Sequence, residues 1–224
     1  MKSSGAALLK KPNNPLASKP ATREEQALFA AGYRRIAGLD EAGRGALAGP
    51  VVAAAVVLPL NADFPWLNRV RDSKLLSPKT RESLFEMMNQ SCIEIGTGIV
   101  APHIIDAVNI LNATKKAMKL ALEQLQNQPD FLLIDAVILP GIRTPQKGII
   151  KGDRLCLSIA CASIVAKVTR DRIMMELDVK YPQYGFYNHK GYGTKEHLAC
   201  LQSYGSCKVH RMTFAPVKAL SRII

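Results

Sequence analysis

Residues 50–58, PVVAAAVVL, form an almost continuous apolar run. A second short run, FLLID at 131–135, ends in an acid. Strands without polar alternation are typical of sheets that are buried on both faces. Helical signals are interleaved with these strands along the chain. The two runs therefore predict central strands of an α/β domain with a mixed sheet.

Helical signals occupy the segments between the strands. Ser77 followed by Pro78 is typical of a helix N-cap and first helical residue, and predicts a helix over about 78–90. An alanine-rich segment predicts a long helix over roughly 157–180, whose small side chains allow close packing on a sheet. Further elements are expected as strands at 33–39 and 92–101, and as helices at 24–31, 102–107, 112–126 and 195–203.

The charge balance is strongly basic. Thirty Lys and Arg stand against 18 Asp and Glu, a net charge of +12, while 48% of the 224 residues are hydrophobic and exclude wholesale disorder. Such a charge favours nucleic acid as a partner, then an anionic membrane or an acidic protein, although a basic surface without a partner stays open. No apolar run reaches the roughly 18 residues that cross a bilayer, and the N-terminal segment does not fit a secretory signal. We expect a cytoplasmic protein with no membrane partner.

The cysteines are odd in number and form no Cys-x-x-Cys pair, which argues against a disulfide framework or a zinc site. We expect reduced and mostly buried thiols. They lie at positions 92, 156, 161, 200 and 207.

Acids end both predicted central strands. Asp40 follows IAGL, and Asp135 follows FLLI. An unpaired carboxylate is costly to desolvate, so a charge at such a place needs a partner. If Glu41 and Asp153 join these two, their mutual repulsion demands a cation, and Mg²⁺ or Mn²⁺ suits oxygen ligands of this kind.

Each acid taken singly has an ordinary explanation as an exposed loop charge or a helix cap, and Asp153 in particular could cap the long helix. Neighbouring strand residues point to opposite faces, so Asp40 and Glu41 share a site only where the strand ends or kinks. Gly43 and Gly45 make such a break plausible. The joint pattern in a basic chain favours the metal site.

Several strings of the sequence closely resemble type 2 ribonuclease H, the bacterial ribonuclease HII family. The resemblance runs from about residue 33 to 218 and rests on several motifs in order along the chain. The motifs are GLDEAGRGALAGPVVAAAVVL from Gly38, DSKLLSP from Asp72, NATKKAM from Asn112, LLID from Leu132, KGD from Lys151, SIACASIVAKVTRDRIM from Ser158, YPQYGFYNHKGYGTKEHL from Tyr181 and HRMTFAPVK from His210.

The resemblance implies an RNase H-like fold, a mixed β-sheet flanked by helices with a C-terminal helical appendage. The polar, basic composition of residues 1–30 predicts a flexible basic N-terminal extension, and a shift to basic and aromatic residues after 180 predicts a separate segment at 181–224. With the resemblance, residues 31–180 are expected to form the catalytic domain, and 181–224 a substrate-binding segment that packs on it. A monomer is expected.

The resemblance also implies an activity. The family hydrolyses the RNA strand of RNA–DNA hybrids and nicks duplex DNA 5′ of embedded ribonucleotides. Asp40, Glu41, Asp135 and Asp153 would be catalytic residues that bind two Mn²⁺ or Mg²⁺ ions, and the products would carry 3′-OH and 5′-phosphate ends. Asp40 and Asp135 would anchor both ions, and the other two acids would complete one ion each.

Substrate-binding residues follow from the same resemblance. Gly43, Arg44 and Gly45 match an element that contacts the ribose at the cut site, and Tyr192 matches a tyrosine at the junction from ribose to deoxyribose. A flexible turn and an ordinary half-buried tyrosine are the alternatives. Lys74 is expected to contact a backbone phosphate, with a solvated lysine as the alternative.

Other polar residues carry weaker expectations. Asp171 is expected to be balanced by the adjacent Arg170 and Arg172. For the histidines at 189, 197 and 210 we expect structural hydrogen bonds rather than metal ligation. Further candidates for phosphate contacts are Lys167, Arg170, Lys190, Lys195 and Arg211.

Two departures from the family pattern are small. Ala136 stands where glycine is usual, and Cys161 interrupts a usual run of alanines. Two other functions stay open at this point. One is another metal-dependent nuclease or transferase of the same fold, such as a DNA resolvase, which lacks a test for ribose, and the other is a non-catalytic nucleic-acid binder.

Overall fold

The computed structural model describes residues 19–59, 61–91 and 93–220. Its centre is a five-stranded sheet in the order β3-β2-β1-β4-β5. Strand β1 pairs antiparallel with β2 and parallel with β4, so the predicted mixed sheet is confirmed. The strands are β1 (Ile36–Ala42), β2 (Val51–Val57), β3 (Glu94–Val100), β4 (Phe131–Asp135) and β5 (Gln146–Ile149).

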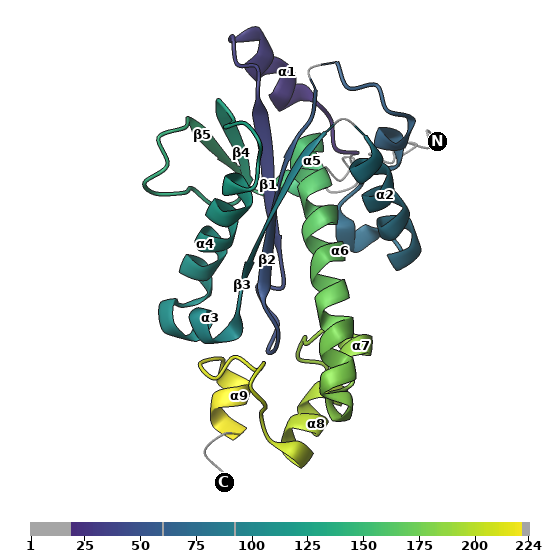
Figure 1. The fold of residues 1–224 in the computed structure, drawn as a ribbon, viewed down its shortest axis with the longest axis vertical. Coiled ribbons are helices and arrows are strands. Elements are labelled where there is room, and N and C mark those ends of the chain that lie inside the picture. The colour runs from purple at the N-terminus through teal and green to yellow at the C-terminus, as the bar shows by residue number, and fades with distance from the viewer. Residues whose placement is uncertain (1–18, 60, 92, 221–224) are drawn as a thin grey trace, which may run out of the picture.

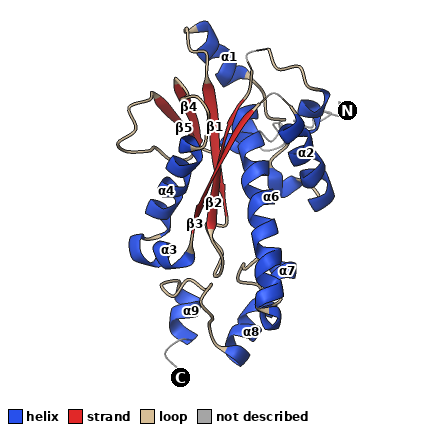
Figure 2. Ribbon diagram, in the orientation of Figure 1, coloured by secondary structure: helices blue, strands red, loops and turns tan. Residues whose placement is uncertain are grey.

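Helices cover both faces of this sheet, as Figures 1 and 2 show. Helix α4 lies on one face, α2 and α6 lie on the other, and α7, α8 and α9 gather at the far end of α6. The α-helices are α1 (Arg23–Ala30), α2 (Pro78–Gln90), α3 (Pro102–Val108), α4 (Ile110–Glu123), α5 (Gly152–Leu155), α6 (Leu157–Lys180), α7 (Phe186–His189), α8 (Lys195–Tyr204) and α9 (Ala215–Leu220). Short 3-10 helices are η2 (Pro65–Arg69), η3 (Ser73–Leu75) and η4 (Pro182–Tyr184).

Strand β2 explains why the apolar run has no polar alternation. All its residues are buried. Ala53 and Ala55 face the core on the α4 side, whereas Ala54 and Val56 face the core under α2 and α6. Both sides of the strand therefore need apolar side chains.

Helix α6 packs closely on β1 because the contact residues are small. A Cβ atom on Gly38 would lie 2.3 Å from the main-chain carbon of Ser158, so only glycine fits there. Ala160 and Ala162 are fully buried in the same layer. The helix begins and ends as its sequence predicts.

Local signals set the other boundaries. Ser77 caps α2 by accepting a hydrogen bond from the N–H of Thr80 at 3.1 Å, as predicted. Strand β1 begins later than predicted, because the N–H groups of Arg34 and Arg35 donate to the carboxylate of Asp130 at 2.7 and 2.9 Å instead of joining the sheet. Strand β5 has a polar sequence at the sheet edge and was not predicted.

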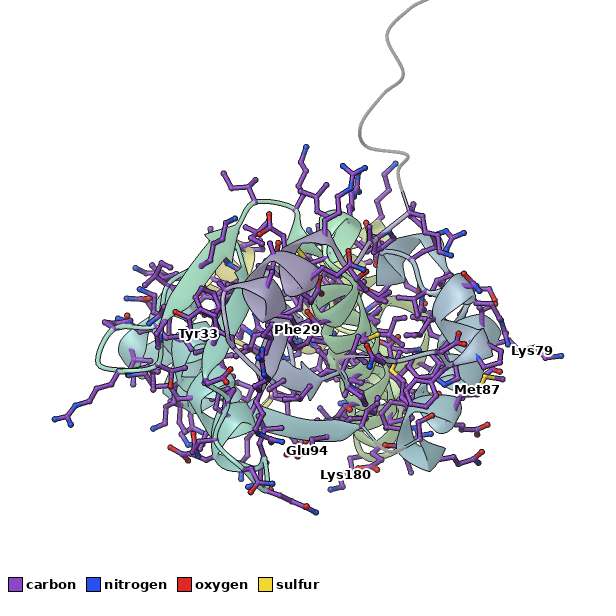
Figure 3. All side chains as sticks on the ribbon, turned by 90° about the horizontal axis from the view of Figure 1, so that it is seen from above. Phe29, Tyr33, Lys79, Met87, Glu94 and Lys180 are labelled. Carbon is purple, nitrogen blue, oxygen red and sulfur yellow. The ribbon has the colours of Figure 1, made fainter. Side chains whose placement is uncertain are left out.

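Residues 1–18 of the predicted N-terminal extension lie outside the described residues. Helix α1, which follows them, is hydrogen-bonded to α6. The buried Glu25 accepts hydrogen bonds from the N–H and hydroxyl of Ser158 at 2.9 and 2.7 Å. Phe29 and Tyr33 pack over the end of the sheet where β1 begins (Figure 3). The division of the chain at 30/31 and 180/181 stays a prediction.

No helix in the described part of the chain is long and apolar enough to span a membrane. The four cysteines that the structure describes are free thiols: Cys156, Cys161, Cys200 and Cys207.

Candidate active site

The two acids that end the central strands lie side by side. Strands β1 and β4 are parallel, and their last paired residues are Leu39 and Ile134. The next residues along the two strands are Asp40 and Asp135. Because parallel neighbours end at the same edge of a sheet, both carboxylates leave the sheet at one place.

Asp40 and Glu41 both belong to β1, which continues to Ala42. We expected the two acids to share a site only where the strand ends or kinks, and the strand does not end between them. Instead, the pairing with β4 stops at Leu39, so β1 has no neighbour on that side beyond this point. Asp40 is buried, and its Oδ1 accepts the N–H of Glu41 at 2.6 Å.

Asp153 reaches the same place through a bonded turn. The Oδ1 of Asp135 accepts the N–H of Gly152 at 2.7 Å, which fixes the start of α5. Asp153 lies in the first turn of α5 and is buried. It does not cap the long helix, because α6 begins after Cys156, so the alternative of a helix cap for α6 is wrong.

The carboxylates affect one another's protonation. Burial raises the pKa of Asp40 well above its ordinary value, and the charges of Glu41, Asp135 and Asp153 raise it further. Burial, then Asp72 and Asp135, raise the pKa of Asp153 to about 6. Burial also raises the pKa values of Glu41 and Asp135. These groups therefore form one cluster in which burial and mutual repulsion oppose ionisation.

The chemistry of this cluster fits a hard divalent ion. Its donors are all carboxylate oxygens, and Oε2 of Glu41 is buried without a hydrogen-bond partner among the described residues. In the described ranges, no three acidic, histidine or cysteine side chains are grouped so that they could hold a metal ion as they stand. The cluster supplies donors of a suitable kind, one of which has no partner in the part of the chain that the structure describes.

Two cations border the cluster. Nη1 of Arg44 lies 3.6 Å from Oε1 of Glu41, and Nζ of Lys74 lies 3.8 Å from Oδ2 of Asp153. Burial lowers the pKa of Lys74, but Asp153 and other nearby acids outweigh it, so the net shift is upward. The side chain of Lys74 is 77% exposed and is accessible to a ligand.

A main-chain hydrogen bond joins the loop that contains the Gly-Arg-Gly turn to the segment that carries Tyr192. The turn at 43–45 follows β1, and Gly43 has a φ of +89°, which favours glycine. Tyr192 is half-buried, and the carbonyl of the preceding Gly191 accepts the N–H of Leu47 at 2.8 Å. Tyr192 also lines a cavity of about 500 Å³ between α2, α6 and the α7 region.

Similarity to known proteins identifies the family of this chain. The family model described as "Ribonuclease HII" matches residues 37–217. The chain belongs to the ribonuclease HII family. A ribonuclease HII of Dehalococcoides mccartyi (strain ATCC BAA-2266 / KCTC 15142 / 195) is 51% identical over 210 residues, covering 94% of this chain and 100% of that protein. The chain is accordingly a ribonuclease H, a hydrolase that cleaves within the RNA of RNA–DNA hybrids.

Solved structures of ribonucleases H have folds similar to that of this chain. The ribonuclease H2 from Pyrococcus horikoshii OT3 has a TM-score of 0.69 and 27% identity, covering 84% of this chain and 97% of that one. Bst-RNase HIII in complex with Mn²⁺ shares the fold, with a TM-score of 0.62, 18% identity and coverage of 88% of this chain and 72% of that one.

In this ribonuclease HII, two of the predicted phosphate contacts are wrong. Arg170 and Arg211 are fully buried, so they do not reach solvent where a phosphate would lie. The charge of Asp171 is balanced locally, as predicted, but by ion pairs with other residues than expected. Asp171 lies 2.6 Å from Nζ of Lys167 and 3.8 Å from Nη2 of Arg81, whereas Arg172 pairs with Glu82.

The histidines at 189, 197 and 210 form structural hydrogen bonds, as predicted. The Nε2 atoms of His197 and His210 lie 3.1 Å apart, and Nε2 of His189 lies 2.8 Å from the carbonyl of Tyr184. Burial, reinforced by His197, lowers the pKa of His210 to about 4. His210 therefore stays neutral near pH 7, and the hydrogen bonds of the three rings link the C-terminal helices.

Asp72 is a structural residue of the site that no sequence pattern pointed to on its own. This buried acid accepts the N–H of Lys74 at 3.0 Å and pairs with Nε of Arg154 at 3.0 Å. It thereby fixes the segment that carries Lys74, and its charge raises the pKa of Asp153. The sequence did mark this residue, because Asp72 begins the DSKLLSP motif on which the family resemblance partly rests.

Proposed function

We propose that this chain nicks duplex DNA 5′ of embedded ribonucleotides as well as cutting the RNA of longer hybrids, with a mechanism that uses two divalent ions. The products would carry 3′-OH and 5′-phosphate ends. The observation that supports this best is the convergence of Asp40 and Asp135 at one edge of the sheet, in electrostatic contact with Glu41 and Asp153.

In this proposal the four carboxylates hold the ions. Asp40 and Asp135 leave neighbouring strands together, so they are best placed to serve both ions, while Glu41 and Asp153 would each complete one. Two Mg²⁺ or Mn²⁺ ions supply Lewis-acid stabilisation of the attacking and leaving oxygens when bound. Binding would remove the repulsion that now raises the pKa of Asp40, and would give Oε2 of Glu41 a partner.

The ribose would be recognised by the turn at 43–45 and by Tyr192. The 2′-OH both donates and accepts hydrogen bonds, so main-chain groups can detect it without reading a base. Gly45 has open space around its Cα, so a sugar can approach the backbone closely. The ring of Tyr192 offers an apolar face for the next sugar, at which a 2′-OH would be disfavoured.

Lys74 and the net charge of +12 would hold the phosphate backbone. Lys74 borders the acidic cluster and is largely exposed, so its ammonium group can meet a phosphate next to the scissile one. Contacts of this kind make binding fall steeply as salt is added.

One experiment tests the proposal. Mg²⁺ or Mn²⁺ is titrated against a duplex with a single ribonucleotide, a long hybrid and an all-DNA duplex, and the product ends are identified. Cleavage of the first two that depends on the ion, with a nick 5′ of the ribonucleotide, supports the proposal. Equal cleavage of all-DNA duplex would indicate a nuclease without a ribose test, and binding without cleavage at any ion concentration would indicate a non-catalytic binder.

A further inference from the structure

Two buried arginines hold the loop at residues 43–50, which connects β1 to β2 and contains the Gly-Arg-Gly turn. Arg170 comes from α6, and Arg211 comes from the segment before α9; both have an exposed fraction of 0%. No carboxylate oxygen of the described residues lies within ion-pair distance of either guanidinium. Burying two unpaired cations is costly, so their main-chain partners must stabilise them.

Arg211 binds three carbonyl groups of this loop. Its Nη2 donates to the carbonyl of Gly43 at 2.7 Å, and its Nη1 donates to the carbonyl of Arg44 at 2.9 Å. Its Nε and Nη2 donate to the carbonyl of Gly49 at 3.1 and 3.0 Å. The planar guanidinium fork can serve several acceptors at once, which an ammonium group on a single carbon cannot do in the same geometry.

These bonds set the direction of two peptide planes in the turn. In a trans peptide the carbonyl of one residue and the N–H of the next point in opposite directions. With the carbonyls of Gly43 and Arg44 turned toward Arg211, the N–H groups of Arg44 and Gly45 point away from it. Both residues are exposed, and neither N–H donates to a group of the described residues. Arg211 thereby presents two free donors on the outer side of the turn.

Arg170 connects the same loop to Tyr192. Its Nε and Nη2 donate to the carbonyls of Pro50 and Ala48 at 3.0 and 3.1 Å. A Cβ atom on Gly43 would lie 1.9 Å from Nε of Arg170, so the loop lies directly against this side chain. On another side, the guanidinium lies 5.2 Å from the centre of the Tyr192 ring, within the range of a cation–π contact.

We propose that Arg170 and Arg211 are positioning residues for ribose discrimination: Arg211 aims the N–H groups of Arg44 and Gly45 at the 2′-OH, and Arg170 holds the distance between this turn and Tyr192. The inference rests on the proposed function, because it assigns the turn and the tyrosine to recognition of the cut site. Neither arginine touches the substrate.

The test uses Arg211→Lys and Arg170→Lys, which keep the charge but lose the fork. We expect kcat/KM on a duplex with one ribonucleotide to fall about ten- to a hundredfold, mainly in kcat, because small misplacements of reacting groups are that costly. Affinity for all-DNA duplex in Ca²⁺ and the Mn²⁺ concentration for half-maximal cleavage should stay as in the wild type. All assays are run well below the melting temperature of each variant.

The matched control is Arg35→Lys. Arg35 likewise donates to a main-chain carbonyl, that of Asn127 at 3.0 Å, and pairs with Glu94, but it lies before β1 at the end away from the turn. It should lose stability without losing kcat. If the variants at 170 and 211 keep wild-type kcat, the inference is wrong. It is also wrong if their affinity for all-DNA duplex falls by the same factor as their kcat/KM on the ribonucleotide duplex. If the wild type itself does not cut the ribonucleotide duplex, the proposed function is wrong instead.

A measurement on the wild type covers the case in which the variants do not fold. Hydrogen exchange at the amides of Arg44 and Gly45 should be fast in the free protein and slow in Ca²⁺ with a duplex that carries one ribonucleotide. An all-DNA duplex should slow it less. Slow exchange in the free protein, or equal slowing by both duplexes, would overturn the proposal.

Discussion

Replacing Asp153 by asparagine should stabilise the metal-free protein at neutral pH. Burial and neighbouring acids raise the pKa of Asp153 from 3.8 to about 6. The folded state therefore holds its proton more tightly than the unfolded state does, and ionisation costs stability. With about 1.36 kcal/mol for each pKa unit, the free energy of unfolding should rise by about 3 kcal/mol in the variant at pH 7.5. The attraction of Lys74 for the ionised carboxylate is already included in this net shift.

The sign of the pH dependence follows from the same shift. A group whose folded pKa is raised costs nothing below its unfolded pKa, and the full cost is present above its folded pKa. The gain of Asp153→Asn should therefore be small at pH 4, grow between pH 4 and 6, and stay constant above about pH 6. For a chain of this size, about 3 kcal/mol corresponds to a rise of roughly 5–10 °C in melting temperature.

Urea unfolding of both proteins at pH 4 and pH 7.5, in the presence of a chelator, measures the effect. Asp63→Asn is the control, because Asp63 is exposed and its substitution should change stability by no more than about 0.5 kcal/mol. Added Mn²⁺ should reduce the advantage of the variant. A variant that is less stable than the wild type at pH 7.5, or a gain that is the same at both pH values, would refute this account of the cluster.

Three further outcomes are expected. Asp135→Asn should keep the Oδ1 bond to Gly152 and bind hybrid, but lose cleavage by at least about a hundredfold; wild-type turnover by this variant would contradict its role. Tyr192→Ala should reduce kcat/KM on a single ribonucleotide more than on a long hybrid, and equal losses would argue against a junction contact. Ala136→Gly should raise the free energy of unfolding by about 0.5–1 kcal/mol in urea, because Ala136 has a φ of +54° that glycine adopts without strain; a loss of stability would count against that explanation.

The sequence alone determined the elements that depend on local signals. Ser77 and Pro78 marked the start of α2, and the apolar runs marked β2 and β4, because capping and burial on both faces act through neighbouring residues. The acids at the ends of buried runs, Asp40 and Asp135, could also be recognised from the sequence, because a buried charge requires a partner of opposite charge or a hydrogen bond.

Only the tertiary structure decided which polar groups meet. The register of β1 against β4 brings Asp40 beside Asp135, and the early end of β4 lets Glu41 join them within a continuous strand. From the sequence, Arg170 and Arg211 were candidates for phosphate contacts, which would require them to reach the surface. They are buried because the loop at 43–50 turns its carbonyls inward, and those acceptors come from residues more than 100 positions away in the chain. A hydrogen bond over that separation depends on how helices and strands pack, which no local pattern records.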